Sequence, residues 1–304
     1  MNLYKIVAFL ISVPVLLGTG QTDLATVAEV IETEYALVES APEGLATPEA
    51  PSAEMVDLQE NVPLAPIPFV SSDESITFSY EYVADEDGVI IPYGLFTPSS
   101  AEFNEKTPLI VWLHGSGERN VSQTSFENTG LPYVLKRWTL HGFNAYVVCP
   151  QLYRQFDTGL WMKDEAVDNL KALLQELTTK YNIDPERIIL TGHSLGGQGS
   201  TYIASKMPDV FSCVAVLSGY DCYMDLPIDV PVCGYVGSTA YGESSTSHSY
   251  MTGDFRNEYP TAEVYVLNSS HGDLPWDAFN RDLNEDNKSD LIEWMLNRTK
   301  PKNN

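Results

Sequence analysis

A serine lies between glycines in a segment whose flanks fix the local fold. The segment Gly-His-Ser-Leu-Gly-Gly, residues 192–197, follows a largely apolar run at 187–191 that is typical of a buried parallel strand. It precedes residues 198–207, whose small side chains suit a tightly packed helix. A strand, a Gly-x-Ser-x-Gly turn and a helix form a nucleophile elbow, in which the glycines avoid clashes and the serine is held strained at the sheet edge. Ser194 is therefore the candidate nucleophile.

Strand-like runs alternate with helical segments from about residue 70 onward. Residues 76–83 and 89–96 alternate apolar and polar side chains, which predicts antiparallel strands joined by a turn. Residues 164–181 have apolar side chains at helical spacing. Continuous apolar runs, typical of buried parallel strands, cover residues 108–113, 145–149, 188–191, 213–217, 230–236 and 264–267. This order predicts one α/β domain with a mostly parallel sheet, an antiparallel start and helices on both faces.

A glycine-rich run, residues 114–120, directly follows the strand that is predicted to end at Leu113. Glycines let the backbone turn sharply there and present N–H groups toward the elbow. An acyl-transfer serine needs such donors for the negative oxygen that develops in the reaction. We expect these donors to be the backbone N–H of Ser116, or of an adjacent residue, and that of Leu195.

The general base for Ser194 is sought among five histidines. In folds built around this elbow, the acid and then the histidine follow the serine along the chain, which leaves His248 and His271. His271 lies in a turn after the last predicted strand, at the sheet edge that carries the elbow. His271 is therefore the predicted base.

The acid that orients the base is less sharply marked. It is sought after the strand at 230–236, but the following loop, residues 237–243, lacks the usual aspartate. Glu243 is the carboxylate closest to that place, and glutamate can replace aspartate. Asp221, at the end of the preceding strand, is the alternative. We predict Glu243 and leave Asp221 open, since both could also be surface charges.

A second motif fits a twelve-residue calcium loop at residues 282–293. Oxygen side chains stand at positions 1, 3, 5 and 9, position 7 offers a backbone carbonyl, and a glutamate stands at position 12. The ligands would be Asp282, Asn284, Asp286, Lys288, Asp290 and Glu293. A bound Ca²⁺ would be structural and would brace the loop that carries His271. The alternative is an acidic loop in which Ser289 or Asp290 caps the last helix.

The first 68 residues differ in composition from the rest of the chain. Residues 1–20 hold Lys5, a short apolar run and small residues, which predicts a cleaved signal peptide and no stable membrane insertion of the mature protein; the alternative is an uncleaved membrane anchor. Residues 21–68 are acidic and rich in proline, which predicts a disordered linker. The catalytic domain is predicted to span residues 69–300, and the protein is predicted to be secreted or extracellular.

The formal net charge of −25 argues against nucleic-acid partners and anionic membrane surfaces, because both bind through Lys and Arg. Four cysteines in an exported protein permit two disulfides. Cys222–Cys233 is the easiest bridge to form. Cys149, Cys213 and Cys233 nevertheless lie in apolar strand-like runs, where free cysteine is an ordinary core residue.

The chain resembles the α/β-hydrolase superfamily, in particular secreted bacterial esterases and predicted peptidases related to feruloyl esterases and polyhydroxybutyrate depolymerases. The matching segments are residues 113–119, 149–151, 181–188 and 191–197. The resemblance implies serine ester hydrolysis through an acyl-enzyme, with no cofactor for catalysis. The chain departs from the family pattern at two places: Asn120 stands where such motifs usually have glycine, and the usual aspartate after Gly237 is missing.

The sequence therefore predicts an exported serine esterase that acts on a small-molecule or polysaccharide-linked ester. Gln151, Tyr153 and Trp161, after the strand that ends at Cys149, are candidates for the walls of the substrate pocket. A serine peptidase or amidase on the same fold is the alternative among enzymes. A non-catalytic surface-binding module is the alternative outside them.

Overall fold

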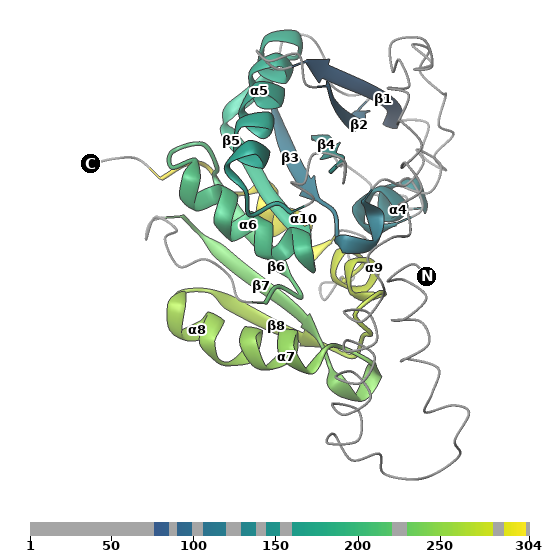
Figure 1. Cartoon of the computed structure of the whole chain (residues 1–304), viewed down its shortest axis with the longest axis vertical. Helices are drawn as coiled ribbons and strands as arrows, with labels where there is room; N and C mark the ends of the chain where they lie inside the picture. Colours follow the sequence, from purple (N-terminus) through teal and green to yellow (C-terminus); the bar gives the residue numbers. More distant parts are fainter. Residues whose placement is uncertain are drawn as a thin grey trace, which may run out of the picture. The chain divides into compact units, whose positions relative to one another are not determined.

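The computed structural model describes residues 76–84, 90–98, 106–119, 129–137, 144–152, 160–220, 230–281 and 289–301. In this part of the chain the strands form one eight-stranded sheet in the order β1-β2-β4-β3-β5-β6-β7-β8 (Figure 1). Two pairs, β1 with β2 and β2 with β4, are antiparallel, and the remaining neighbours are parallel. The predicted fold class is confirmed. The strands are β1 (Ile76–Ala84), β2 (Ile90–Pro98), β3 (Thr107–Leu113), β4 (Tyr146–Pro150), β5 (Ile183–His193), β6 (Cys213–Leu217), β7 (Val232–Gly237) and β8 (Glu263–Leu267).

The helices include those that the sequence predicts after residues 163 and 194 and at the end of the chain, together with several short ones that it does not predict. They are α4 (Gly130–Arg137), α5 (Asp164–Lys180), α6 (Leu195–Lys206), α7 (Ser245–Thr252), α8 (Asp254–Glu258), α9 (Leu274–Phe279) and α10 (Asp290–Leu296), with short 3₁₀ turns η1 (Ser116–Glu118) and η3 (Thr239–Tyr241). Helix α5 buries the apolar stripe that its spacing predicts, including Leu170, Leu173 and Leu177.

Two apolar clusters cover the two faces of the sheet, because successive side chains of a strand point to opposite sides. On β3, Leu109 and Val111 belong to one cluster, which also holds side chains of α5, α6, α7 and α8. Ile110 and Trp112 belong to the other, with side chains of α4, α9 and α10. The central strand is thus buried on both faces, as its continuous apolar run predicts.

Parallel strands place their carboxyl ends at one edge of the sheet, and the candidate residues follow those ends. The glycine-rich loop follows β3, Ser194 follows β5, Glu243 lies shortly after β7, and His271 follows β8. The order β3-β5-β6-β7-β8 therefore gathers residues that lie far apart in the chain (Figure 1).

Cys149, Cys213 and Cys233 are buried free thiols. A Cys222–Cys233 bridge is therefore not formed, and the interpretation of these residues as core cysteines is the one that agrees with the structure. Cys213 and Cys233 lie on the neighbouring strands β6 and β7 and share one apolar cluster. Among the described residues, no helix is long and apolar enough to span a bilayer. The proposed signal peptide and linker lie outside the described residues.

Candidate active site

Ser194 lies in a sharp turn between β5 and α6 with φ 56° and ψ −115°. Its N–H donates to the carbonyl of Leu217 on β6, at 2.9 Å. The flanking glycines are sterically required. A Cβ on Gly196 would lie 1.9 Å from the carbonyl oxygen of Leu113, and one on Gly192 would lie 2.5 Å from that of Gly196. The serine thus has the strained geometry of a nucleophile elbow, which holds its side chain at the carboxyl edge of the sheet.

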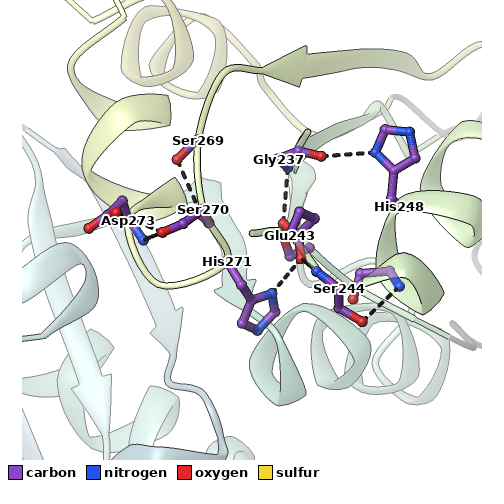
Figure 2. Close-up of polar contacts among 10 residues, drawn as sticks. Gly237, Glu243, Ser244, His248, Ser269, Ser270, His271 and Asp273 are labelled. Atoms are coloured by element: carbon purple, nitrogen blue, oxygen red, sulfur yellow. Dashed lines mark hydrogen bonds and ion pairs between the residues drawn. The ribbon is translucent and has the colours of Figure 1, made fainter. Parts of the chain in front are cut away.

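His271 and Glu243 are directly bonded, with 2.6 Å between Nδ1 of the imidazole and Oε1 of the carboxylate (Figure 2). The carboxylate is fully buried, whereas a third of the imidazole side chain is exposed. Oε1 also accepts the N–H of Ser244 at 2.8 Å. The second carboxylate oxygen accepts the Ser218 hydroxyl and, at 3.0 Å, the N–H of Gly237.

These bonds keep Glu243 ionised. Burial alone would raise the pKa of this carboxyl, but the hydrogen bonds from His271, Ser218 and Gly237 outweigh it and lower the pKa to about 2. An ionised acceptor at Nδ1 fixes the imidazole as the tautomer with its proton there, so Nε2 is left to take a proton. His271 also bonds through its backbone N–H to the carbonyl of Gly242 at 3.4 Å.

The structure does not place the alternative base, His248, against Glu243. Nδ1 of His248 lies 2.9 Å from the carbonyl of Gly237, and Figure 2 shows this ring on the opposite side of Gly237 from His271. Asp221 lies outside the described residues. The structure therefore brings Glu243 and His271 together and gives His248 a separate backbone contact.

The glycine-rich loop after β3 is held by bonds to its carbonyl groups. Nε1 of Trp161 donates to the carbonyl of His114 at 2.9 Å, and Nε of Arg119 donates to that of Ser116 at 3.0 Å. The side-chain amide of Gln151 donates to the carbonyl of Glu118. Gln151 and Trp161 are both buried. In the structure, these two predicted pocket residues thus brace this loop, and Tyr153 lies outside the described residues.

His114 determines how the first turn of this loop is oriented. Its Nε2 accepts the N–H of Leu152 at 3.0 Å, so its Nδ1 carries the proton and donates it to the carbonyl of Gly115 at 2.7 Å. Burial lowers the pKa of His114 to about 4, which keeps the ring neutral. In a trans peptide the N–H points away from the C=O, so the N–H of Ser116 faces away from the His114 ring.

The loop also approaches the serine closely. A Cβ on Gly115 would lie 3.6 Å from Cβ of Ser194 and 2.9 Å from a carboxylate oxygen of Glu118. Leu195 is the first residue of α6, and the first amides of a helix have no partner within it. The N–H groups of Ser116 and Leu195 therefore come from two segments that meet beside Ser194.

Comparison with protein-family models gives one match in this region. Residues 159–289 match the family "Esterase", described as "Putative esterase", and this span contains Ser194, Glu243 and His271. Among curated proteins, human arylacetamide deacetylase-like 2 is 32% identical over 146 residues, which are 45% of this chain and 32% of that protein. Poly(3-hydroxyalkanoate) depolymerase C of Paucimonas lemoignei is 28% identical over 129 residues, 38% of this chain and 29% of that protein. The chain thus spans about a third of the length of these relatives.

Solved structures of esterases and related hydrolases share the fold. A thermostable esterase superposes with a TM-score of 0.54 at 19% identity, over 73% of this chain and 63% of its own. The S-formylglutathione hydrolase of Staphylococcus aureus gives 0.54 at 15% identity, over 73% and 97%. A ferulic acid esterase gives 0.52 at 16% identity, over 66% and 94%. These likenesses show that the chain has the α/β-hydrolase fold.

Three residues of this candidate site are not singled out by the sequence. Ser218 follows β6 with φ 45° and bonds the carboxylate of Glu243. Glu118 sits in the glycine-rich loop, where burial raises the pKa of its carboxyl. His193 packs its ring against that of His271, with 4.7 Å between the ring centroids. A polar residue directly beside a predicted catalytic residue or strand end is the one signal that could have marked Ser218 and His193.

The predicted calcium loop lies mostly outside the described residues, which include only Asp290 and Glu293 of its six ligands. Ser289 caps α10, its hydroxyl accepting the N–H of Ile292 at 3.2 Å. The carboxylate of Asp290 lies 3.5 Å from Nε of Arg281. Within the described part of the chain, no group of three or more His, Cys, Asp or Glu side chains is arranged to hold a metal. The capping role that the alternative assigns to Ser289 is present.

Proposed function

We propose that this chain is a serine carboxylesterase with Ser194 as nucleophile, His271 as general base and Glu243 as the orienting acid. The observation that carries the proposal is the 2.6 Å bond between Nδ1 of His271 and a buried, ionised Glu243, at the sheet edge where the strained Ser194 lies. A buried carboxylate that orients an imidazole beside a nucleophile elbow is the arrangement that acyl transfer requires.

The reaction follows from the roles of these groups. Nε2 of His271 takes the proton of the Ser194 hydroxyl as the serine oxygen bonds to the ester carbonyl carbon. The carbonyl oxygen gains the negative charge and accepts the N–H groups of Ser116 and Leu195. The intermediate collapses when the carbon–oxygen bond to the alcohol breaks and His271 returns its proton to the leaving oxygen. Water then repeats these steps on the acyl-enzyme and releases the acid.

A fluorophosphonate probe tests the proposal directly. The wild-type protein should take one label per chain, and Ser194→Ala should take none. Ser205→Ala is the matched control, because Ser205 also lies on α6 and its hydroxyl donates to the carbonyl of Tyr202 on the same helix. Absence of label on the wild-type protein would refute the proposal of a serine esterase and favour the non-catalytic binding module.

The substrate class is the second part of the proposal. We infer an ester whose acid or alcohol part is a small molecule or is linked to a polysaccharide, because the matched family and relatives include esterases, a polyester depolymerase and a fold neighbour that is a ferulic acid esterase. A panel of p-nitrophenyl alkanoates, 3-hydroxyalkanoates, feruloyl esters and the matching amides tests it. Faster turnover of the amides would support the peptidase or amidase instead.

The N-terminal segment and the acidic loop complete the proposal. Residues 1–20 would direct export, residues 21–68 would tether the domain, and Ca²⁺ would bind at 282–293. N-terminal sequencing of the protein from the culture medium tests export: a mature chain that still starts at Met1 refutes signal cleavage. For calcium, we expect a chelator to lower the melting temperature. A melting temperature that the chelator leaves unchanged would refute calcium binding at residues 282–293.

A further inference from the structure

Glu118 is a partly buried residue of the glycine-rich loop whose carboxylate the proposed reaction does not use. Its oxygen Oε2 lies 2.9 Å from the place that a Cβ on Gly115 would occupy. Cβ of Ser194 lies 3.6 Å from the same place. The carboxylate and the nucleophile therefore lie close together beside Gly115.

The backbone of Glu118 is held on both sides. Its N–H donates to the carbonyl of Gly115 at 3.4 Å, which closes the 3₁₀ turn η1. Its carbonyl accepts the side-chain amide of Gln151, which is itself buried. Because both bonds fix the main chain of Glu118, its side chain extends from a fixed point next to the nucleophile.

The surroundings of Glu118 affect its charge in two directions. Burial raises the pKa of the carboxyl, whereas hydrogen bonds and the charge of His271 act against this rise. We expect the group to be ionised at pH 8. An ionised carboxylate only accepts hydrogen bonds, and it repels other negative charges.

A negative charge beside Ser194 affects an ester according to the groups that the ester carries. With no partner, the charge disfavours the negative oxygen of the intermediate. A hydroxyl or ammonium group on the substrate would donate to the carboxylate and offset this repulsion. A carboxylate on the substrate would add a second repulsion. Glu118 can therefore discriminate between substrates by the group next to the ester.

We propose that Glu118 is a specificity-determining residue, which selects esters with a hydroxyl or ammonium donor close to the scissile bond and rejects esters with a carboxylate there. The inference rests on the proposed esterase function and narrows its substrate class. The formal net charge of −25 adds a general repulsion of anions, so the test separates the local charge from the overall one.

Two substitutions of similar length separate the charge of Glu118 from its acceptor oxygens. Glu118→Gln removes the charge and keeps one acceptor oxygen, whereas Glu118→Met removes both. Glu186→Gln is the matched control for overall charge. Glu186 is exposed near the start of β5, whereas Ser194 follows the other end of that strand.

Two pairs of ethyl esters of similar shape report the two properties through kcat/KM at pH 8. Monoethyl succinate and ethyl levulinate differ in a charge, and ethyl 3-hydroxybutyrate and ethyl 3-methylbutyrate differ in a hydroxyl. In wild type and in Glu186→Gln, we expect the anionic ester to react about tenfold more slowly than its neutral partner. We expect the hydroxy ester to react about tenfold faster than its methyl partner.

The variants of Glu118 should change these ratios in different ways. In Glu118→Gln the discrimination against the anion should fall to about threefold or less, with the preference for the hydroxyl largely kept. In Glu118→Met both ratios should approach one. Any ester that wild type turns over too slowly is measured as a competitive inhibitor of p-nitrophenyl acetate hydrolysis, and the ratios are taken from the inhibition constants.

Each ratio compares two substrates of one variant, so a general loss of activity does not move it. A charge ratio unchanged in Glu118→Gln, or changed equally in Glu186→Gln, would overturn the proposal. So would a hydroxyl preference that is retained in Glu118→Met. If Glu118→Met does not fold by circular dichroism, the two glutamine variants decide. A wild type that takes no fluorophosphonate label refutes the esterase itself, whereas a labelled wild type whose ratios do not depend on Glu118 refutes only this inference.

Discussion

Replacing Glu243 by glutamine removes one charge from the centre of the site and leaves the side-chain length unchanged. The carboxylate accepts four hydrogen bonds, from His271, Ser218, Gly237 and Ser244. A glutamine can accept only through its single oxygen, so its NH₂ group must face donors that have no acceptor left. The bond to His271 is then lost or reversed, and reversal places the imidazole proton on Nε2, where it blocks proton removal from Ser194.

The magnitude follows from the pKa. The pKa of Glu243 lies at about 2 against an ordinary value of 4.5, and each tenfold change in ionisation is worth about 1.4 kcal/mol. Burial opposes the hydrogen bonds, and their net effect stabilises the charge by about 3 kcal/mol. Glu243→Gln should lower the free energy of unfolding at pH 7 by about that amount. It should also lower kcat about 10³- to 10⁴-fold, because the wrong tautomer of the base predominates.

The assay is steady-state hydrolysis of a p-nitrophenyl ester at pH 7.5, together with urea unfolding of the same preparations. Asp221→Asn is the control, because it neutralises the other carboxylate that the sequence leaves open. We expect its kcat to stay within about threefold of wild type. The reasoning is refuted if Glu243→Gln keeps more than a tenth of the wild-type kcat, or if Asp221→Asn loses as much as Glu243→Gln does.

Further outcomes follow from the same contacts. Because the pKa of Glu243 is lowered, its contribution to stability is present above pH 4.5 and is lost as the pH falls toward about 2. The free energy of unfolding, measured at decreasing pH, should show this loss in wild type and not in Glu243→Gln. Gly196→Ala should destabilise the protein by about 3 kcal/mol or more in urea unfolding, since its Cβ would overlap the carbonyl of Leu113. Gly272→Ala is the control and should unfold like wild type, because a Cβ there meets nothing within 4 Å. Trp161→Phe removes the indole N–H that donates to the carbonyl of His114. It should cost about 1–2 kcal/mol and lower kcat about tenfold at unchanged KM; an unaltered kcat would contradict the bracing of the loop.

The elbow and the sheet could be predicted because each depends on a local rule. A Cβ on Gly192 would meet the backbone of Gly196 within the turn, and one on Gly196 would meet Leu113 on the neighbouring strand β3, so both glycines are needed where such a turn packs against a sheet. The buried strands can be recognised in the sequence as continuous apolar runs. The short helices α7 and α8 carry few apolar residues each, so their periodicity is too weak to be recognised.

The loops could not be predicted to the same depth, because sequence does not tell which way a loop side chain points. Gln151 and Trp161 follow the right strand for a pocket, yet their polar groups donate to the carbonyls of Glu118 and His114. Glu243 and Asp221 both follow strand ends, and only the path of the chain after β7 decides that Glu243 meets His271. The ring of His193 packs against that of His271, which lies far along the chain, and no local pattern records that contact.

The two carboxylate oxygens of Glu243 have different partners: one contacts the base, and the other contacts the ends of two strands. One faces the imidazole, and the other is held by Ser218 after β6 and Gly237 at the end of β7. A glutamate is one methylene longer than aspartate, so it can reach the histidine from a place further along the loop. The acid of such an enzyme can therefore migrate along its loop during evolution if the side chain lengthens to compensate. A search that demands aspartate at the customary position would discard this chain as inactive.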